Sequence, residues 1–143
     1  MSISLFTDNS KQIVVKIYCA IHKEHGNVIC DPDKAQLADL YKGSIDVDAI
    51  EEQSMTFRYP TYGDMNKIMD SGVKMNEESN FVVSPVQLRY ERLCTLASAW
   101  SLKDGEKDIP LNRENIKKLD PVIAAHFAMG LEKALRDKGL TLD

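Results

Sequence analysis

An alternating pattern of side chains over residues 11–21 is the feature that most constrains the fold of this chain. Neighbouring side chains of a strand point to opposite faces, so a period of two is typical of a strand with one buried face. The positions on the predicted inward face are Ile13, Val15, Ile17, Cys19 and Ile21. A polar turn at Gly26 and Asn27 follows, and residues 28–30 can return as a short antiparallel partner. A β-hairpin is therefore predicted near the start of the chain.

A further strand is predicted just before Pro60. Met55, Phe57 and Tyr59 alternate with polar neighbours, and Pro60 ends this strand because it lacks the amide that a ladder needs. Between the hairpin and this strand, an acidic stretch is expected to hold a helical turn near residues 47–50. Residues 73–83 are expected to be a polar connector.

Helices are marked by residues that suit their first turn. The expected start signals are Asp31 before Pro32, Thr61 three residues before Asp64, Ser84 before Pro85, Asn112, and Asp120 before Pro121. Gly43, Gly72 and Gly139 are expected near helix ends. The longest of the middle helices is expected to end near Trp100, because apolar residues recur at helical spacing from Val86 onward.

These elements predict an α+β fold with a small N-terminal antiparallel β region, a hairpin plus one further strand, and a mainly helical C-terminal half. We expect residues 1–143 to form a single domain, with a strand-rich part over residues 1–60 and a helical part over residues 61–143. A chain of 143 residues can bury a core without disulfides or metal.

Charge and cysteine content restrict the expected partners and compartment. The net charge of −4, without a basic cluster, argues against nucleic acid as a partner. The opening residues do not resemble an export signal, and no apolar run approaches the roughly 20 residues of a membrane span. Three cysteines cannot all pair, so we expect free thiols in a reducing cytosol and no membrane association.

One cluster of residues has the chemistry of a metal site. Cys19, His22, His25 and Cys30 are ligand types that bind zinc, but their spacing is unusual. The strand prediction instead places Cys19 on the inward face and both histidines in an exposed turn, so two buried thiols and two solvated imidazoles are favoured. Because the chain also lacks phosphate-binding glycine loops and a nucleophile elbow, we expect no cofactor and no enzymatic activity.

Tryptophan and methionine residues leave two interpretations open. Trp100 is either a core anchor or an exposed contact for another protein, and its place on a buried stripe favours the core. The methionines either fill gaps in the core or line an adaptable surface that receives apolar helices. Those considered are Met55, Met65, Met69 and Met75.

The later segments have a recognisable layout. They read SMTFRYPTYGDMNKIMD and RLCTLASAWSLKDGEKDIPLNRENIKKLDPVIAAHFAMGLEKAL. The residues that define this layout are Tyr59-Pro60-Thr61, Trp100, Leu102, Asp104-Gly105, Ile109-Pro110-Leu111, Glu114-Asn115-Ile116, Leu119 and Pro121. Over residues 54–138 this layout resembles the tail assembly chaperones of tailed bacteriophages, in which a final amphipathic helix follows such a phrase.

The resemblance implies a non-enzymatic protein of the host cell cytoplasm that covers the phage tape-measure protein and recruits tail-tube protein during assembly. On their helical spacing, we expect five residues to form a partner-binding groove or its supporting core: Met65, Met69, Trp100, Phe127 and Leu131. The strand at residues 11–21 lies outside the pattern, which leaves open a structural tail or baseplate component of the virion. A small zinc-binding regulator is the second alternative, and self-association also stays open.

Overall fold

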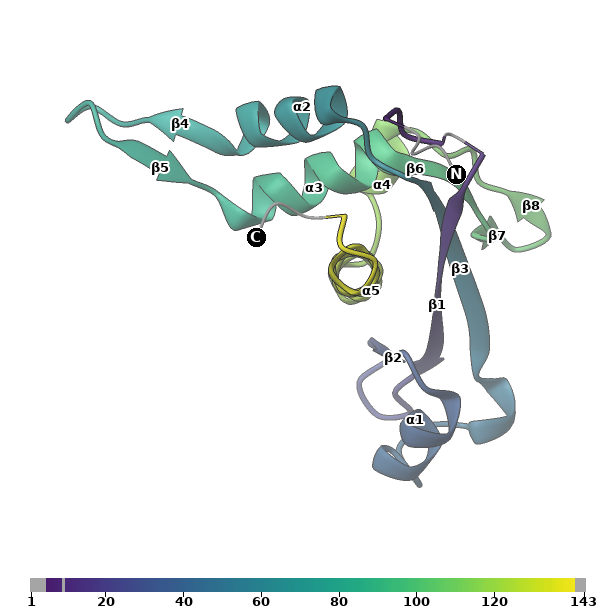
Figure 1. The fold of residues 1–143 in the computed structure, drawn as a ribbon. Helices are drawn as coiled ribbons and strands as arrows, with labels where there is room; N and C mark the ends of the chain where they lie inside the picture. The colour runs from purple at the N-terminus through teal and green to yellow at the C-terminus, as the bar shows by residue number, and fades with distance from the viewer. Residues whose placement is uncertain (1–4, 9, 141–143) are drawn as a thin grey trace.

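The computed structural model describes residues 5–8 and 10–140. Its centre is an antiparallel sheet with the strand order β2-β1-β3-β6 (Figure 1). The strands are β1 (Gln12–Ile21), β2 (Val28–Asp31), β3 (Glu51–Arg58) and β6 (Ala97–Trp100). β1 and β3 pair from Gln12 opposite Arg58 to Cys19 opposite Glu51. The predicted hairpin, the strand before Pro60 and the α+β class are confirmed.

The two faces of β1 are buried by different parts of the chain. Ile13, Val15 and Ile17 pack in the main core with β3 and with α5 (Pro121–Asp137), which lies against β1 (Figure 1). Beyond them, a second cluster covers the opposite face with Ala20, Ile29, Leu37 and Ile45. The predicted inward position of Ile21 is wrong, because its side chain is 57% exposed. The main core ends before this residue, and the second core lies on the other face of the strand.

The helix starts follow the predicted capping residues with one exception. Thr61, Ser84, Asn112 and Asp120 cap α2 (Tyr62–Gly72), α3 (Pro85–Leu96), α4 (Arg113–Lys117) and α5. The first helix, α1 (Lys34–Leu40), is capped by Asp33 and not by Asp31. Asp31 already ends β2, and its Oδ1 accepts a hydrogen bond from the Asp33 amide at 2.8 Å. The predicted helical turn is the 3-10 helix η1 (Val47–Ala49).

Two segments differ from the sequence prediction. The helix expected to end near Trp100 ends at Leu96, and the next four residues form β6 on the edge of β3, with Trp100 opposite Met55. The expected polar connector is a β-hairpin of β4 (Val73–Met75) and β5 (Phe81–Val83). The Asp-Gly turn joins two further short strands, β7 (Lys103–Asp104) and β8 (Lys107–Asp108). In each of these segments, hydrogen bonding to another strand determines the structure. The helical periodicity of a segment does not show which strand edges are free to pair with it.

A close approach joins α5 to the sheet. A Cβ atom at Gly130 would overlap Val15 Cγ1, so glycine lets the helix backbone lie directly against β1. α5 is the longest helix, with 17 residues. Neither this helix nor any other in the described part of the chain has the length and apolar character of a membrane span.

Candidate interaction surface

An arm made of α2, β4, β5 and α3 projects away from the sheet (Figure 1). α2 and α3 pack against each other, and a Cβ atom at Gly72 would overlap the side chain of Leu88. The Ser84 amide donates a hydrogen bond to the Gly72 carbonyl oxygen at 2.8 Å, which joins the two helices where the β-hairpin begins. The β-hairpin therefore extends from the joined ends of two packed helices.

The tip of the arm is a hydrogen-bonded turn. The Asn76 side-chain oxygen accepts from the amides of Glu78 and Asn80, at 3.0 and 2.9 Å. Ser79 has a φ of 63°, in the left-handed region that turns use. The Asn76 amide also donates to the Asn80 carbonyl oxygen at 2.8 Å. This turn sets the register of β4 and β5 and hence the face on which each side chain lies.

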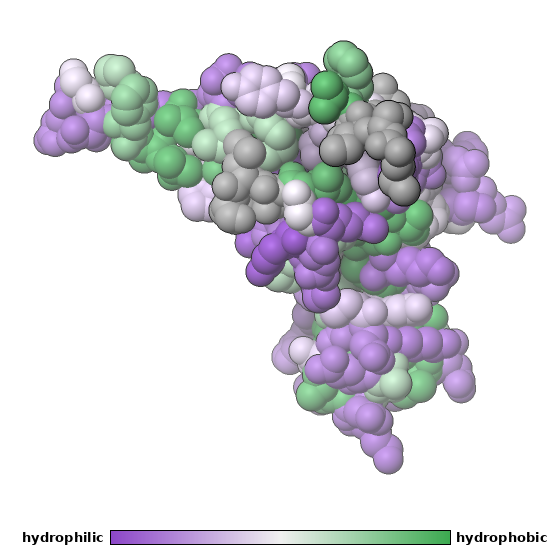
Figure 2. Space-filling view, in the orientation of Figure 1, coloured by the Kyte–Doolittle hydropathy of each residue, from purple (hydrophilic) through white to green (hydrophobic). Residues whose placement is uncertain are grey.

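One face of this β-hairpin is wholly apolar. Val73 pairs with Val83, and Met75 pairs with Phe81. Alternate residues of a strand share a face, so these four side chains, here called the hairpin face, lie together. Met75, Phe81 and Val83 are 60%, 73% and 53% exposed. Figure 2 shows hydrophobic residues gathered along the arm behind a hydrophilic tip.

Exposed apolar side chains continue beyond the hairpin face onto the helices of the arm. Met69 and Tyr62 on α2, Val82 on β5 and Val86 on α3 are all exposed. A two-stranded hairpin with one uncovered apolar face is marginally stable in water, and large exposed apolar patches mark interaction sites. The arm is therefore the best candidate for a partner-binding surface.

Arg58 anchors the arm to the sheet. Its guanidinium, at the end of β3, donates from Nη2 to Asp64 Oδ1 at 2.7 Å and to the Thr95 carbonyl oxygen at 3.0 Å, and Nη1 pairs with Asp64 Oδ2. Asp64 also accepts from the Thr61 amide at 2.9 Å. Chiefly through Arg58, and against its partial burial, the pKa of Asp64 is lowered to about 2. The Arg58 side chain thus connects β3 to the start of α2 by an ion pair and to the end of α3 by a hydrogen bond.

This anchor predicts a pH-dependent stability. A carboxyl whose pKa is lower in the folded than in the unfolded chain stabilises the fold above its unfolded pKa and loses that effect as pH falls through the folded value. For Asp64 the window runs from about pH 5 to below pH 2. We expect Asp64→Asn to cost about 2 kcal/mol at neutral pH, and about half of that near pH 3. Urea unfolding of both proteins at the two pH values measures this; a deficit that does not change with pH would contradict it.

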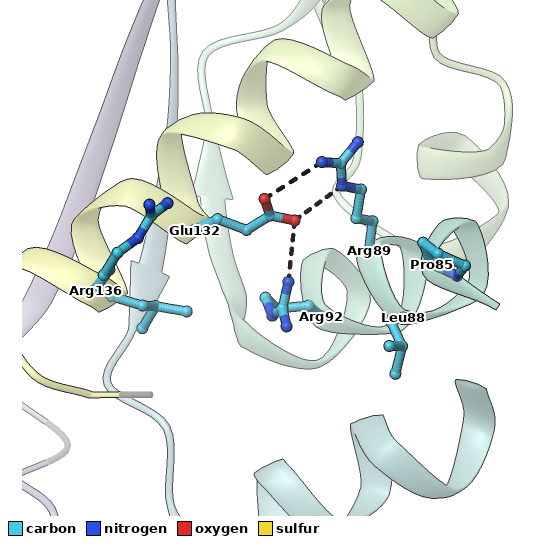
Figure 3. Close-up of a pocket in the computed structure, with 7 residues that line it drawn as sticks. Pro85, Leu88, Arg89, Arg92, Glu132 and Arg136 are labelled. Atoms are coloured by element: carbon cyan, nitrogen blue, oxygen red, sulfur yellow. Dashed lines mark hydrogen bonds and ion pairs between the residues drawn. The ribbon is translucent and has the colours of Figure 1, made fainter. Parts of the chain in front are cut away.

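A cleft of about 430 Å³ separates α3 from the C-terminal half of α5 (Figure 3). Glu132 of α5 accepts hydrogen bonds from Arg89 Nε at 2.9 Å and Arg92 Nη1 at 3.2 Å, and Arg136 also lines the cleft. The one carboxylate is paired with two guanidiniums, and no other lining residue is a base or nucleophile. The ion pairs of Glu132 with Arg89 and Arg92 thus connect the arm to the body across this cleft.

The predicted partner-binding residues fall into three environments. Met69 is 45% exposed on the arm, whereas Met65 is half-buried on the same helix. Phe127 and Leu131 of α5 are 0% exposed in the main core. Of the expected groove and its supporting core, these last two residues belong to the core, and Met69 lies on the arm surface.

Trp100 is half-buried and packs against the main core from β6. Its Nε1 donates a hydrogen bond to the Ile109 carbonyl oxygen at 2.6 Å. With its indole N–H used within the chain and its ring partly covered, Trp100 holds the segment after β6 against the sheet. This placement corresponds to the core interpretation.

The four candidate metal ligands form two separate pairs. Cys19 and Cys30 contact each other, while His22 and His25 stack in the turn with ring centroids 4.6 Å apart. Over residues 5–8 and 10–140, no three His, Cys, Asp or Glu side chains are arranged to hold a metal ion. The zinc-binding alternative therefore has no geometric support in the described chain.

The sequence prediction does not include the hairpin face. It treats Met75 only as one of the methionines, and it assigns Phe81 and Val83 to a polar connector. The signal that could have found them is a pair of short apolar segments, Val73-Lys74-Met75 and Phe81-Val82-Val83, on either side of a polar turn with two Asn residues.

Comparison with family models, curated proteins and solved structures finds no match to this chain.

Proposed function

We propose that this chain is a non-enzymatic tail assembly chaperone of a tailed bacteriophage, which covers the tape-measure protein and recruits tail-tube subunits. The observation that carries the proposal is the hairpin face, on which Met75, Phe81 and Val83 are each more than half exposed. Contiguous exposed apolar side chains of this kind mark a surface that binds a partner.

The arm has the properties that a long apolar helix requires of its cover. Methionine side chains adapt to varied apolar surfaces, and an amphipathic helix is recognised through a row of apolar contacts. Met69 and Met75 lie on the same arm as the aromatic ring of Phe81. Arg58 ties the arm to the sheet, and the hairpin face lies beyond this connection on the projecting arm (Figure 1), so a partner helix can reach it without unfolding the core. The segments that resemble tail assembly chaperones contain most of α2 and the end of α3, and the hairpin lies between them in the sequence.

Co-expression with the tape-measure protein of the same genome tests the proposal. The variant Met75→Ser/Phe81→Ser/Val83→Ser removes three of the four apolar side chains of the hairpin face, and we expect at least an approximately tenfold loss in captured tape-measure protein. The three side chains are exposed, so the fold should remain, and circular dichroism verifies this.

A matched control removes exposed apolar side chains elsewhere. Leu40 of α1 and Val47 of η1 are 64% and 43% exposed. α1 lies at the far end of the sheet from the arm (Figure 1). Leu40→Ser/Val47→Ser should capture tape-measure protein like the wild type. Normal capture by the folded hairpin-face variant, or an equal loss in this control, would refute the assignment of the binding surface.

Purified virions separate the chaperone from a structural tail component. A chaperone leaves when tail-tube subunits take its place, so we expect quantitative mass spectrometry of virions to find far less than one copy of this chain per tail. Stoichiometric amounts would instead identify a tail or baseplate protein.

A further inference from the structure

Cys19 and Cys30 face each other across the first β-hairpin. They are register partners in the ladder of β1 and β2, and their Sγ atoms lie 3.0 Å apart. Both are free thiols. The proposed chaperone function gives this pair no role.

The ladder position of the pair suits a covalent link. The His22 amide donates to the Asn27 carbonyl oxygen at 2.9 Å, so these two residues form the hydrogen-bonded pair beside the turn. Hydrogen-bonded and non-hydrogen-bonded pairs alternate along an antiparallel ladder, and Cys19 with Cys30 lies three pairs further along. The cysteines therefore occupy a non-hydrogen-bonded pair, whose Cα atoms are typically about 4.5 Å apart, within the range of about 4.4–6.8 Å that a disulfide spans.

The two thiols differ in access and acidity. Cys19 is partly exposed and lines a cleft of about 690 Å³ next to α5, whereas Cys30 is 7% exposed. The hydrogen bond with Cys30 lowers the pKa of Cys19 despite its burial, and the same bond, with burial, raises the pKa of Cys30. The accessible thiol is thus the more readily ionised one, and an enclosed thiol lies beside it.

We propose that Cys19 and Cys30 form a dithiol modification site that small disulfides such as oxidised glutathione convert to an intramolecular disulfide. The Cys19 thiolate attacks one sulfur of glutathione disulfide and releases one glutathione thiolate. Cys30 then loses its proton and attacks Cys19 Sγ in the mixed disulfide, which releases the second glutathione. The two cysteines are oxidised, glutathione disulfide is reduced to two glutathiones, and the two thiol protons pass to the released thiolates. The product ties β2 covalently to β1 at the wall of the cleft.

Treatment of the full chain with glutathione disulfide, followed by alkylation and a non-reducing tryptic digest, tests this site. Lys23 lies between the two cysteines, so a disulfide links the peptides of residues 17–23 and 24–34, while Cys94 lies in a third peptide. We expect this linked pair in monomeric protein and an intact mass lower by two hydrogen atoms. The thermal midpoint should rise by about 5 °C or more, because the link restricts the unfolded chain.

Two single variants make the result specific. Cys94→Ser should form the same linked pair, and Cys30→Ser should stop at a stable mixed disulfide on Cys19. A glutathione adduct that persists on Cys19 in the wild type, a link to Cys94, or disulfide-linked dimers as the main product would each overturn the proposal. None of these readouts involves a phage partner, so the test is independent of the chaperone assignment.

Discussion

Replacement of Phe127 by alanine is expected to lower the free energy of unfolding by about 3–5 kcal/mol. Phe127 lies on α5 and is 0% exposed among the side chains of β1 and β3. The variant loses the transfer free energy of the ring and leaves a cavity that packed neighbours fill only partly. Urea unfolding at neutral pH measures the effect as a lower midpoint with an unchanged slope.

Phe81→Ala is the matched control for this loss. The same side chain is removed, but Phe81 is 73% exposed on the hairpin face. Its replacement should change the free energy of unfolding by no more than about 0.5 kcal/mol, while it weakens partner capture. Equal stability losses in the two variants would show that the core and the arm surface have been wrongly distinguished.

The contrast between these two phenylalanines shows what the sequence can predict about a candidate site. Helical spacing correctly places Phe127 and Leu131 on one apolar stripe of α5. Spacing alone does not say whether the stripe is covered by the chain itself or by a partner, and here the chain's own sheet covers it. Phe81 is the opposite case, since it is exposed. Its short apolar strand lies within a polar segment, and its exposure could not be predicted from the sequence.

Features decided by neighbouring residues were predictable. The capping box of Thr61 and Asp64 needs two side chains only three residues apart, and proline at the first helical position needs only its own ring. The long alternation of β1 was equally readable, because one strand buries the same face over most of its length. These interactions involve little of the rest of the chain.

Features decided by distant pairing were not predictable. Ala97 to Trp100 continue the apolar periodicity of α3, yet they leave the helix because the edge of β3 offers hydrogen bonds. The second core is similar, since Ala20 is buried only where α1 packs behind the sheet. The periodicity of one segment does not show which distant segment of the chain pairs with it or covers it.

The same limit applies to the pair of Glu91 and Arg113, which joins α3 to α4. Glu91 is 5% exposed, and Arg113 binds its carboxylate through two guanidinium nitrogens, Nη1 at 2.9 Å from Oε2 and Nη2 at Oε1. The pKa of Glu91 is lowered, chiefly by Arg113 and against its burial. From the sequence alone, each of the two residues is expected to be a charged side chain on a helix surface. Only the fold shows that Glu91 is buried.

Arg113→Ala is therefore expected to cost about 2–4 kcal/mol at neutral pH, because a buried carboxylate loses its partner while its desolvation remains. Urea unfolding of the variant and the wild type measures this cost. Without Arg113, burial should hold the pKa of Glu91 above its unfolded value. The deficit should then be largest above that pKa and shrink as pH falls through it and the carboxylate takes up a proton.

The double variant Glu91→Leu/Arg113→Met separates an unpaired charge from lost packing. Removal of both charged groups leaves no buried charge without a partner, so its stability should lie well above that of Arg113→Ala and near the wild type. If the double variant is as unstable as Arg113→Ala, the side-chain packing of the pair, and not its charge, joins α3 to α4. The ionic connections of the arm to the body would then be those of Arg58 with Asp64 and of Glu132 with Arg89 and Arg92.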